Sequence, residues 1–295
     1  MSKIFEALRK TEGGAANIAM SVLGEEPFPI AEPMVTPPQD AIEAEAPTHV
    51  PPPGQATPVS ETRVEAIRIA AASPLLPFDG SDAGAAEQYK IMRTKLFHHP
   101  EQPRMLLVSS PMAGDGKTIT AANLAGALAL LADLRVLLID CDFRHSSLTK
   151  LLGFSSTTGL SEILRGEATL ESSLISVEQF PNLYFLPSGS AVLNPSELLS
   201  TAKWQALLEV FRREFRFTVF DAPPIGMVAD YEQLQLACDG VVLVARPDHT
   251  NRRLWRKAVE IVPKSKQLGV ILNCVEDWFL WKTNSYYHYH SGKPQ

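Results

Sequence analysis

The chain is poor in cysteine and in basic charge, and it lacks a long apolar run. Its three cysteines, Cys141, Cys238 and Cys274, lie in or beside apolar segments without metal-ligand spacing, which predicts buried thiols in a reducing compartment and no disulfide framework. A net charge of -6 argues against a protein that coats nucleic acid. No apolar run approaches the roughly 20 residues of a membrane span, and residues 1–10 lack the apolar core of a secretory signal. We therefore expect a cytoplasmic protein.

Proline is abundant but unevenly placed, because twelve of its 23 residues lie between positions 27 and 77. A segment so rich in Pro, Ala and Glu cannot bury enough apolar surface to offset the entropy of ordering the chain. We predict a disordered linker over residues 13–82, with a transient helix at residues 61–69. Before it, residues 1–12 form a short amphipathic helix in this interpretation.

After the linker, continuous apolar runs alternate with segments of helical spacing. The predicted strands lie at residues 105–109, 135–140, 182–187, 217–221, 240–245 and 268–273, and the predicted helices include 86–97, 118–132 and 194–215. This alternation predicts an α/β fold with a doubly wound, mainly parallel sheet and right-handed crossovers. The folded domain is expected over residues 83–276, followed by a Tyr-rich tail over residues 277–295.

A glycine-containing loop joins the first predicted strand to a helix. Gly114 and Gly116 let backbone N–H groups turn toward an anion, and the helix N-terminus adds a partial positive charge. Lys117 can reach the terminal phosphates, and Thr118 can offer its hydroxyl to Mg²⁺. Pro111 stands where the usual phosphate-loop pattern has its first glycine. The predicted ATP site consists of Ala113, Gly114, Asp115, Gly116, Lys117 and Thr118.

Two later strands end in carboxylates, at Asp140 and at Asp221. The carboxyl ends of parallel strands share one edge of a sheet, where ligands bind. Carboxylates beside a phosphate loop repel the phosphates unless a cation lies between them, so the pattern predicts Mg²⁺ held by Thr118, Asp140 and Asp221. Asp140, or else Asp142, is expected to orient the nucleophile. Each Asp taken alone could instead be a helix cap or turn residue.

The phosphate loop, the segment from Val136 to Arg144 and the segment from Thr218 to Pro224 together resemble the Walker A, A′ and B motifs of the bacterial protein-tyrosine kinases (BY-kinases). This family lies within the MinD/ParA-like phosphate-loop ATPases. The similarity runs from about residue 87 to residue 273. It implies an ATP- and Mg²⁺-dependent tyrosine autokinase that regulates exopolysaccharide or capsule synthesis or export.

The resemblance also assigns roles to further residues. Tyr286, Tyr287 and Tyr289 match the family's C-terminal tyrosine cluster, which implies autophosphorylation. A tail that begins beyond the last strand reaches a neighbour's site more easily than its own, so we expect phosphorylation in trans. Glu87, Lys90 and Arg93 match its ring-forming motif, except that Lys90 replaces an arginine and lacks the planar, bidentate pairing of a guanidinium. Asn273 matches a position that contacts adenine in related ATPases. Lys117 is expected to neutralise the transferred phosphoryl group and Arg144 to position an aspartate or the substrate.

The partners implied by the resemblance are a membrane polysaccharide co-polymerase or chain-length regulator with a cytoplasmic activating segment, further copies of this chain in a ring or dimer, and a tyrosine phosphatase. Recruitment to the inner face of the cell membrane would follow from the first of these. Two alternatives stay open. A MinD/ParA-type positioning ATPase is opposed by the tyrosine tail and by Met112, which occupies the place of its additional lysine. A non-catalytic nucleotide-binding regulator of polysaccharide assembly is kept open by Pro111 and Lys90.

Overall fold

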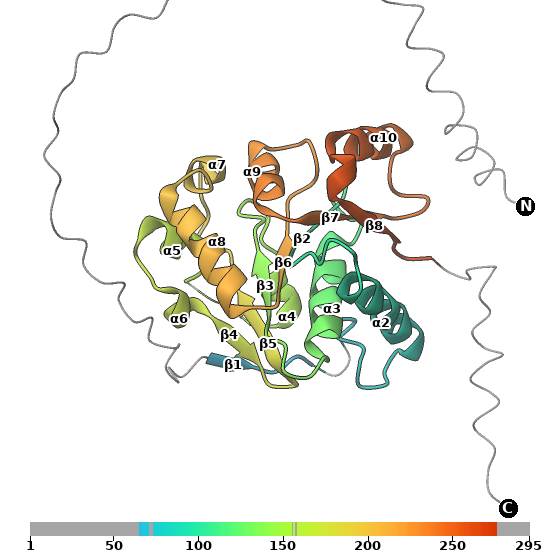
Figure 1. Ribbon diagram of the computed structural model, residues 1–295, viewed down its shortest axis with the longest axis horizontal. Helices are drawn as coiled ribbons and strands as arrows, with labels where there is room; N and C mark the ends of the chain where they lie inside the picture. The colour runs from blue at the N-terminus through green and yellow to red at the C-terminus, as the bar shows by residue number, and fades with distance from the viewer. Residues whose placement is uncertain (1–64, 71–72, 155, 157, 276–295) are drawn as a thin grey trace, which may run out of the picture. The chain divides into compact units, whose positions relative to one another are not determined.

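The computed structural model of the chain describes residues 65–70, 73–154, 156 and 158–275. The helix expected at residues 1–12 and the tail at residues 277–295 lie outside these residues. The described part forms an eight-stranded sheet with the order β1-β4-β5-β3-β6-β2-β7-β8 (Figure 1). All neighbouring strands are parallel except β4 and β5, which form an antiparallel pair. The expected doubly wound, mainly parallel α/β sheet is confirmed.

The strands are β1 (Glu65–Ile67), β2 (Met105–Ser109), β3 (Val136–Asp140), β4 (Ile175–Val177), β5 (Phe180–Leu186), β6 (Phe217–Asp221), β7 (Gly240–Ala245) and β8 (Gln267–Leu272). The helices are α2 (Ala83–Phe97), α3 (Lys117–Ala129), α4 (Leu148–Leu152), α5 (Leu160–Arg165), α6 (Leu170–Ser173), α7 (Pro195–Leu198), α8 (Ala202–Glu214), α9 (Ala229–Ala237) and α10 (Arg252–Ile261), with a 3₁₀ turn at Lys264–Lys266.

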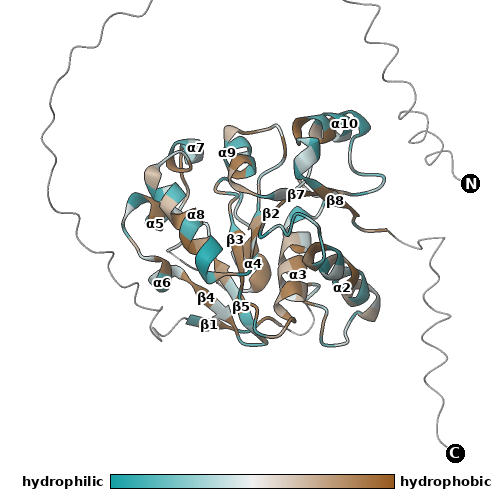
Figure 2. Cartoon of the chain, viewed as in Figure 1, coloured by the Kyte–Doolittle hydropathy of each residue, from teal (hydrophilic) through white to brown (hydrophobic). Residues whose placement is uncertain are grey.

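The helices cover both faces of the sheet and divide the core into two clusters. One cluster packs α2, α3 and α4 on the sheet, and the other packs α5, α6, α8, α9 and α10 on the opposite face. Strands β2, β3 and β6 are buried along their whole length, as expected for strands covered on both sides. Figure 2 shows the resulting pattern, with hydrophobic residues along the central strands and α3 and hydrophilic residues along α8 and α10.

The ordered chain extends further toward the N-terminus than the sequence predicts. Residues 65–67, which were expected within a linker and a transient helix, form β1 and pair with β4. Leu75 and Leu76 are buried in the core, and the backbone N–H of Leu76 donates to Asn123 Oδ1 at 2.6 Å. A Cβ on Gly126 would overlap the side chain of Leu76, so this glycine lets the segment pack directly on α3. The linker therefore cannot extend to residue 82.

The helix expected over residues 194–215 is also interrupted. It consists of the short α7 and the longer α8, and α8 begins anew at Thr201, whose hydroxyl accepts from the backbone N–H of Trp204 at 3.2 Å. A threonine N-cap satisfies a backbone donor that a continuous helix would bond internally. Local capping thus overrides the apolar periodicity on which the single-helix prediction depended.

Candidate functional site

The loop between β2 and α3 has the backbone of a phosphate cradle. Gly114 and Gly116 have φ of 85° and 94°, a region that favours glycine, and Gly116 is the N-cap of α3. A Cβ on Gly116 would overlap the side-chain amide of Asn273. Pro111 is not among the positive-φ residues of the described chain, so no glycine is needed at that position. The departure from the usual pattern at Pro111 is therefore compatible with the cradle.

The side chain of Asp115 faces into the protein and holds the loop in shape. It is fully buried, and its Oδ1 accepts a hydrogen bond from Thr250 Oγ1 at 2.7 Å and lies 2.9 Å from His249 Nδ1. Its Oδ2 accepts from the backbone N–H of Met112 at 3.1 Å. Asp115 can thus offer a ligand only its backbone. The sequence analysis did not identify His249 and Thr250 as part of the site, because two polar residues in the loop after β7 do not form a recognisable motif.

Asn273 lies beside this loop and contacts its backbone. Its Nδ2 donates to the backbone carbonyl of Asp115 at 3.0 Å, and its backbone N–H donates to Ala245 O at 2.8 Å. The side chain therefore ties the end of β8 to the phosphate loop. The contact with adenine expected for Asn273 stays a prediction, and in this structure the amide already has a protein partner.

Lys117 lies at the meeting point of the three predicted motifs. Its Nζ lies 3.1 Å from Asp142 Oδ2 and 3.8 Å from Asp221 Oδ1, and its side chain is 11% exposed. The hydroxyl of the adjacent Thr118 is 3.5 Å from the same Nζ. The parallel register of β3 and β6, which aligns Asp140 with Asp221, brings the two strand ends to the loop that follows β2. The structure thus brings together the residues that were expected to share one edge of the sheet.

The electrostatics of this cluster shift several protonation equilibria. Burial raises the pKa of Asp221 to about 7, against the opposing attraction of the Lys117 ammonium. Burial also raises the pKa of Asp140 to about 6, although hydrogen bonds from Ser146 and from the backbone of Asp142 oppose it. Burial lowers the pKa of Lys117, but the negative charges of Asp221 and Asp142 outweigh it, and the net effect is an increase. Lys117 is therefore a permanent cation among carboxylates.

Asp140 and Asp142 differ in what their oxygens contact. Asp140 Oδ1 accepts from the backbone N–H of Asp142 at 3.1 Å, and its Oδ2 accepts from Ser146 Oγ at 2.7 Å. Both oxygens of Asp140 thus order the loop after β3. Asp142 instead accepts from the backbone N–H of His145 at 3.0 Å with one oxygen and contacts Lys117 with the other. Of the two carboxylates, only Asp142 makes a direct contact with Lys117.

The residues of the cluster fit a magnesium ion held with few protein ligands. Asp221 Oδ1 is buried and has no hydrogen-bond partner among the described residues, and a cation would satisfy it. The described residues contain no group of three His, Cys, Asp or Glu side chains arranged to hold a metal. Mg²⁺ in phosphate sites keeps several waters and takes only one or two carboxylates with the phosphates. Asp221 and the hydroxyl of Thr118 match that requirement better than Asp140, whose oxygens are engaged.

Arg144 is anchored by a residue that sequence reasoning missed. Its Nε donates to Asp230 Oδ2 at 3.1 Å, and Asp230 is 1% exposed in the first turn of α9. The second oxygen of Asp230 has no partner among the described residues. The pair joins the loop after β3 to α9 and leaves the guanidinium side chain 41% exposed.

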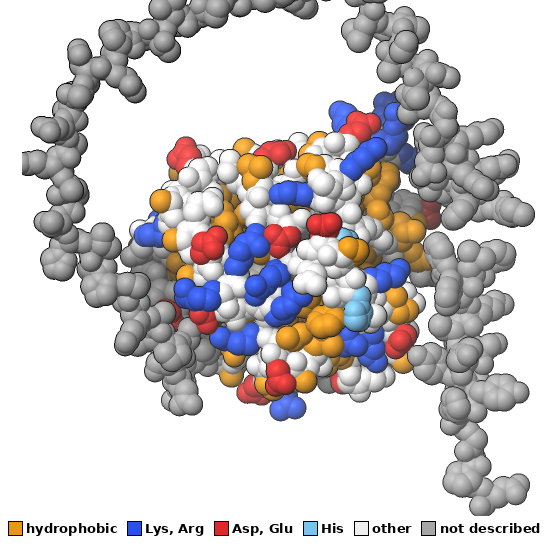
Figure 3. Space-filling view, in the orientation of Figure 1, with side chains coloured by type: hydrophobic (Ala, Val, Ile, Leu, Met, Phe, Trp, Pro, Cys, Tyr) orange, Lys and Arg blue, Asp and Glu red, His pale blue; other side chains and the backbone are white. Residues whose placement is uncertain are grey.

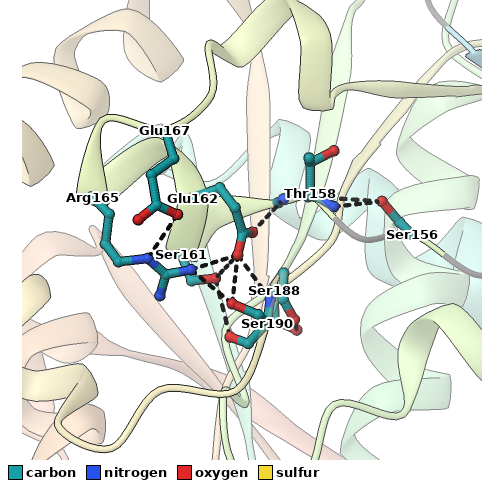
Figure 4. Close-up of polar contacts among 10 residues, drawn as sticks. Ser156, Thr158, Ser161, Glu162, Arg165, Glu167, Ser188 and Ser190 are labelled. Atoms are coloured by element: carbon teal, nitrogen blue, oxygen red, sulfur yellow. Dashed lines mark hydrogen bonds and ion pairs between the residues drawn. The ribbon is translucent and has the colours of Figure 1, made fainter.

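A second polar network lies at the carboxyl end of β5 (Figure 4). Glu162 accepts hydrogen bonds from the backbone N–H groups of Gly159 and Ser190 at 2.8 and 3.1 Å, and from Arg165 Nη2 at 2.6 Å. A Cβ on Gly189 would overlap the Glu162 carboxylate. The network fixes the loop after β5 against α5, next along the sheet from the cluster around Lys117.

The three residues of the expected oligomerisation motif lie on α2, and each contacts its own chain. Lys90 Nζ is 3.6 Å from Glu87 Oε2 within the helix. Arg93 Nη1 donates to Ala127 O at 3.3 Å and thereby joins α2 to α3. Tyr286, Tyr287 and Tyr289 lie outside the described residues. Within the described ranges, no helix is both long and apolar enough to cross a membrane.

The sequence and fold are similar to those of known proteins. Residues 104–252 match the AAA domain family. The tyrosine-protein kinase CpsD of Streptococcus agalactiae is 34% identical over 194 residues, covering 65% of this chain and 84% of the relative. The solved kinase domain of VpsO is 32% identical with a TM-score of 0.60, covering 65% of this chain and 95% of the other. The chimerical protein CapA2B2 is 27% identical with a TM-score of 0.66, covering 72% and 94%.

Proposed function

Because the chain belongs to the family of bacterial tyrosine-protein kinases, we propose that it transfers the γ-phosphoryl group of ATP to tyrosines of its own C-terminal segment. The observation that carries the proposal is the position of Lys117 Nζ, between the carboxylates of Asp142 and Asp221 at the end of a phosphate loop. A buried cation there can stabilise negative charge that develops on a transferred phosphoryl group.

Each residue of the cluster has a distinct role in this proposal. The loop N–H groups of residues 113–118 and the ammonium of Lys117 bind and orient the phosphates. Thr118 and Asp221 are the residues that would hold Mg²⁺, which neutralises phosphate charge when bound. Asp142 aligns the attacking tyrosine hydroxyl and accepts its proton, while Asp140 keeps the loop after β3 in place. The pair of Arg144 and Asp230 joins the same loop to α9.

Alignment can supply most of the rate here. A tyrosine hydroxyl has a pKa near 10 and is protonated at neutral pH, but in a loose phosphoryl-transfer transition state its proton can leave late. A positioned carboxylate is then sufficient. Asp142 contacts Lys117, so phosphates bound to the Lys117 ammonium would compete with this carboxylate and leave it available to the tyrosine.

The acceptors in this proposal are Tyr286, Tyr287 and Tyr289 of a neighbouring copy. Each phosphotyrosine adds about -1.5 to -2 charges, so a fully modified tail would carry roughly -5 into a site lined by carboxylates and phosphates. Repulsion would expel it, and the tail becomes a switch between assembled and dispersed states. Assembly through Glu87, Lys90 and Arg93 would require the Lys90–Glu87 pair within α2 to open.

In the cell, we assign this switch to the control of exopolysaccharide or capsule synthesis or export. A membrane co-polymerase with a cytoplasmic activating segment would recruit the kinase to the inner face of the membrane, and a tyrosine phosphatase would reset the tail. These assignments rest on the similarity to the bacterial tyrosine-protein kinases.

The test is phosphotyrosine detection with mass-spectrometric site mapping after incubation with Mg-ATP. We expect phosphate on Tyr286, Tyr287 or Tyr289 in the unmodified chain and none in Lys117→Met. Replacing the three tyrosines with Phe should remove the signal without reducing ATP binding. ATP hydrolysis without phosphotyrosine, even with a candidate membrane-partner segment present, would contradict the proposal and support a positioning ATPase.

A further inference from the structure

Helix α10 and its flanking turns carry an exposed basic patch on an acidic protein. The patch consists of Arg246, Arg252, Arg253, Arg256, Lys257 and Lys264, all of them exposed. None of the six makes an ion pair with a described residue. The exposed acids in the same stretch, Asp248 and Glu260, balance only part of this charge, and the chain as a whole has a net charge of -6. Figure 3 shows Lys and Arg side chains gathered over α10.

The arrangement of these charges is unfavourable for the helix itself. Arg252 and Arg253 occupy the first turn of α10, which contains no acidic residue, so they face the positive end of the helix dipole. Arg252 and Arg256, like Arg253 and Lys257, are four residues apart, a spacing at which like charges destabilise a helix. An anionic surface placed against this face would relieve both repulsions.

The opposite face of α10 fixes the helix to the domain, while one apolar residue stays outside. Ala258 and Val262 are buried in the core, and Trp255 and Val259 pack against it. Leu254 is 41% exposed, in the middle of the four basic residues of the helix. Basic residues around an exposed aliphatic side chain are typical of helices that lie in the plane of a membrane interface, with the charged heads among lipid phosphates.

We propose that the basic patch on α10 docks the protein directly on a membrane surface rich in anionic lipids. Each Lys or Arg near such a surface increases the partitioning of a protein onto the membrane about fivefold. Nucleic acid fits less well, because the exposed side chain of Leu254 would have no role against a phosphate backbone, whereas it can enter the interface of a membrane.

This docking face lies close to the nucleotide site. The turn before α10 contains His249 and Thr250, which contact Asp115, and the N-cap Asn251, whose backbone N–H lies 3.3 Å from Met112 Sδ. The N-terminus of α10 is thus joined to the phosphate loop by direct contacts. This contact with lipid is additional to the proposed recruitment by a membrane protein and does not depend on kinase activity.

The experiment is vesicle flotation of the full chain. Vesicles of phosphatidylcholine alone are compared with vesicles that also contain phosphatidylglycerol, at low and high salt. The test variant is Arg252→Gln/Arg253→Gln/Arg256→Gln. The matched control is Lys95→Gln/Lys150→Gln/Lys203→Gln, which removes three exposed basic charges from other elements. Circular dichroism and ATP binding establish that both variants are folded.

We expect binding to the anionic vesicles only, weakened by salt because surface charges are screened. The α10 variant should bind about a hundredfold more weakly, while the control should lose no more than a few-fold. The proposal is overturned if the unmodified chain does not bind anionic vesicles, or if both variants lose vesicle binding equally. Binding of a nucleic acid or of an acidic polypeptide through the same arginines, without vesicle binding, would assign the patch to a different partner and overturn it as well.

Discussion

Replacing Asp221 with asparagine should stabilise the nucleotide-free protein while disabling its site. The folded pKa of Asp221 is about 7, compared with an ordinary value of 3.8, because burial penalises the charge more than Lys117 favours it. One pKa unit corresponds to about 1.4 kcal/mol. The ionised carboxylate therefore costs the folded state about 4 kcal/mol at pH 8. Asparagine has nearly the same shape and carries no charge, so Asp221→Asn should recover much of that free energy.

The sign of the pH dependence follows from the direction of the shift. A carboxylate whose pKa is raised on folding binds its proton more tightly in the native state, so native stability falls as pH rises from the unfolded pKa to the folded one. At pH 8 the ionisation of Asp221 therefore destabilises the folded state by almost its full amount, whereas at pH 5 it destabilises it by less than about 2 kcal/mol. The stability gain of Asp221→Asn should be larger at pH 8 than at pH 5 by about 2 to 3 kcal/mol.

The assay is urea unfolding of both proteins at the two pH values, without nucleotide or Mg²⁺. Asp239→Asn is the control, because hydrogen bonds from Arg212 and from two backbone N–H groups outweigh the effect of burial and lower the pKa of Asp239. Asp239→Asn should lower the free energy of unfolding at pH 8, and this decrease should become smaller only under acidic conditions. A second measurement should find that Asp221→Asn loses Mg²⁺-dependent ATP binding. If Asp221→Asn is less stable at pH 8, or if its effect is independent of pH, the electrostatic account of the cluster is wrong.

Three further substitutions, the first of them paired with a rescue variant, test the supports of the phosphate loop and of the neighbouring loop after β5. Gly116→Ala should weaken ATP binding at least about tenfold in calorimetric titration, since it strains a left-handed backbone and displaces the amide of Asn273. Adding Asn273→Ala to this variant should not restore ATP binding, because the backbone strain at residue 116 remains. Thr250→Val removes a hydrogen bond to the buried Asp115 carboxylate and should raise KM for ATP several-fold with a smaller effect on kcat, whereas equal losses in both would argue against a positioning role. Glu162→Gln should lower the free energy of unfolding by about 2 kcal/mol at neutral pH through weaker bonds to backbone N–H groups. Because hydrogen bonds from Ser190 and Ser161 outweigh burial and lower the pKa of Glu162, this loss should diminish as pH falls below about 4, and a thermal melt insensitive to pH would refute it.

The central strands were predictable because most of their residues are apolar and follow one another without the alternation of a half-exposed strand. β2, β3 and β6 have apolar residues at most positions and end in a polar residue, β7 has no polar side chain, and such short runs have few alternatives to a strand buried on both faces. β1 and β4 were not predictable in this way. Each has three residues, and β1 lies in a proline-rich region whose composition resembles that of a linker. Its place in the sheet depends on pairing with β4, more than a hundred residues away.

The sequence by itself determined the chemistry of the site, because that chemistry resides in residue types at fixed spacing. Two glycines before Lys117 and Thr118 specify a phosphate loop, and carboxylates at the ends of buried parallel strands must meet at one edge of the sheet. Only the tertiary structure decided how these groups are used. It turned Asp115 inward to His249 and Thr250, gave both oxygens of Asp140 to its own loop, and placed Asp142 against Lys117. The physical reason is that the direction of a side chain, and the burial that shifts its pKa, depend on segments 25 to 135 residues apart in the chain, and no local pattern encodes that contact.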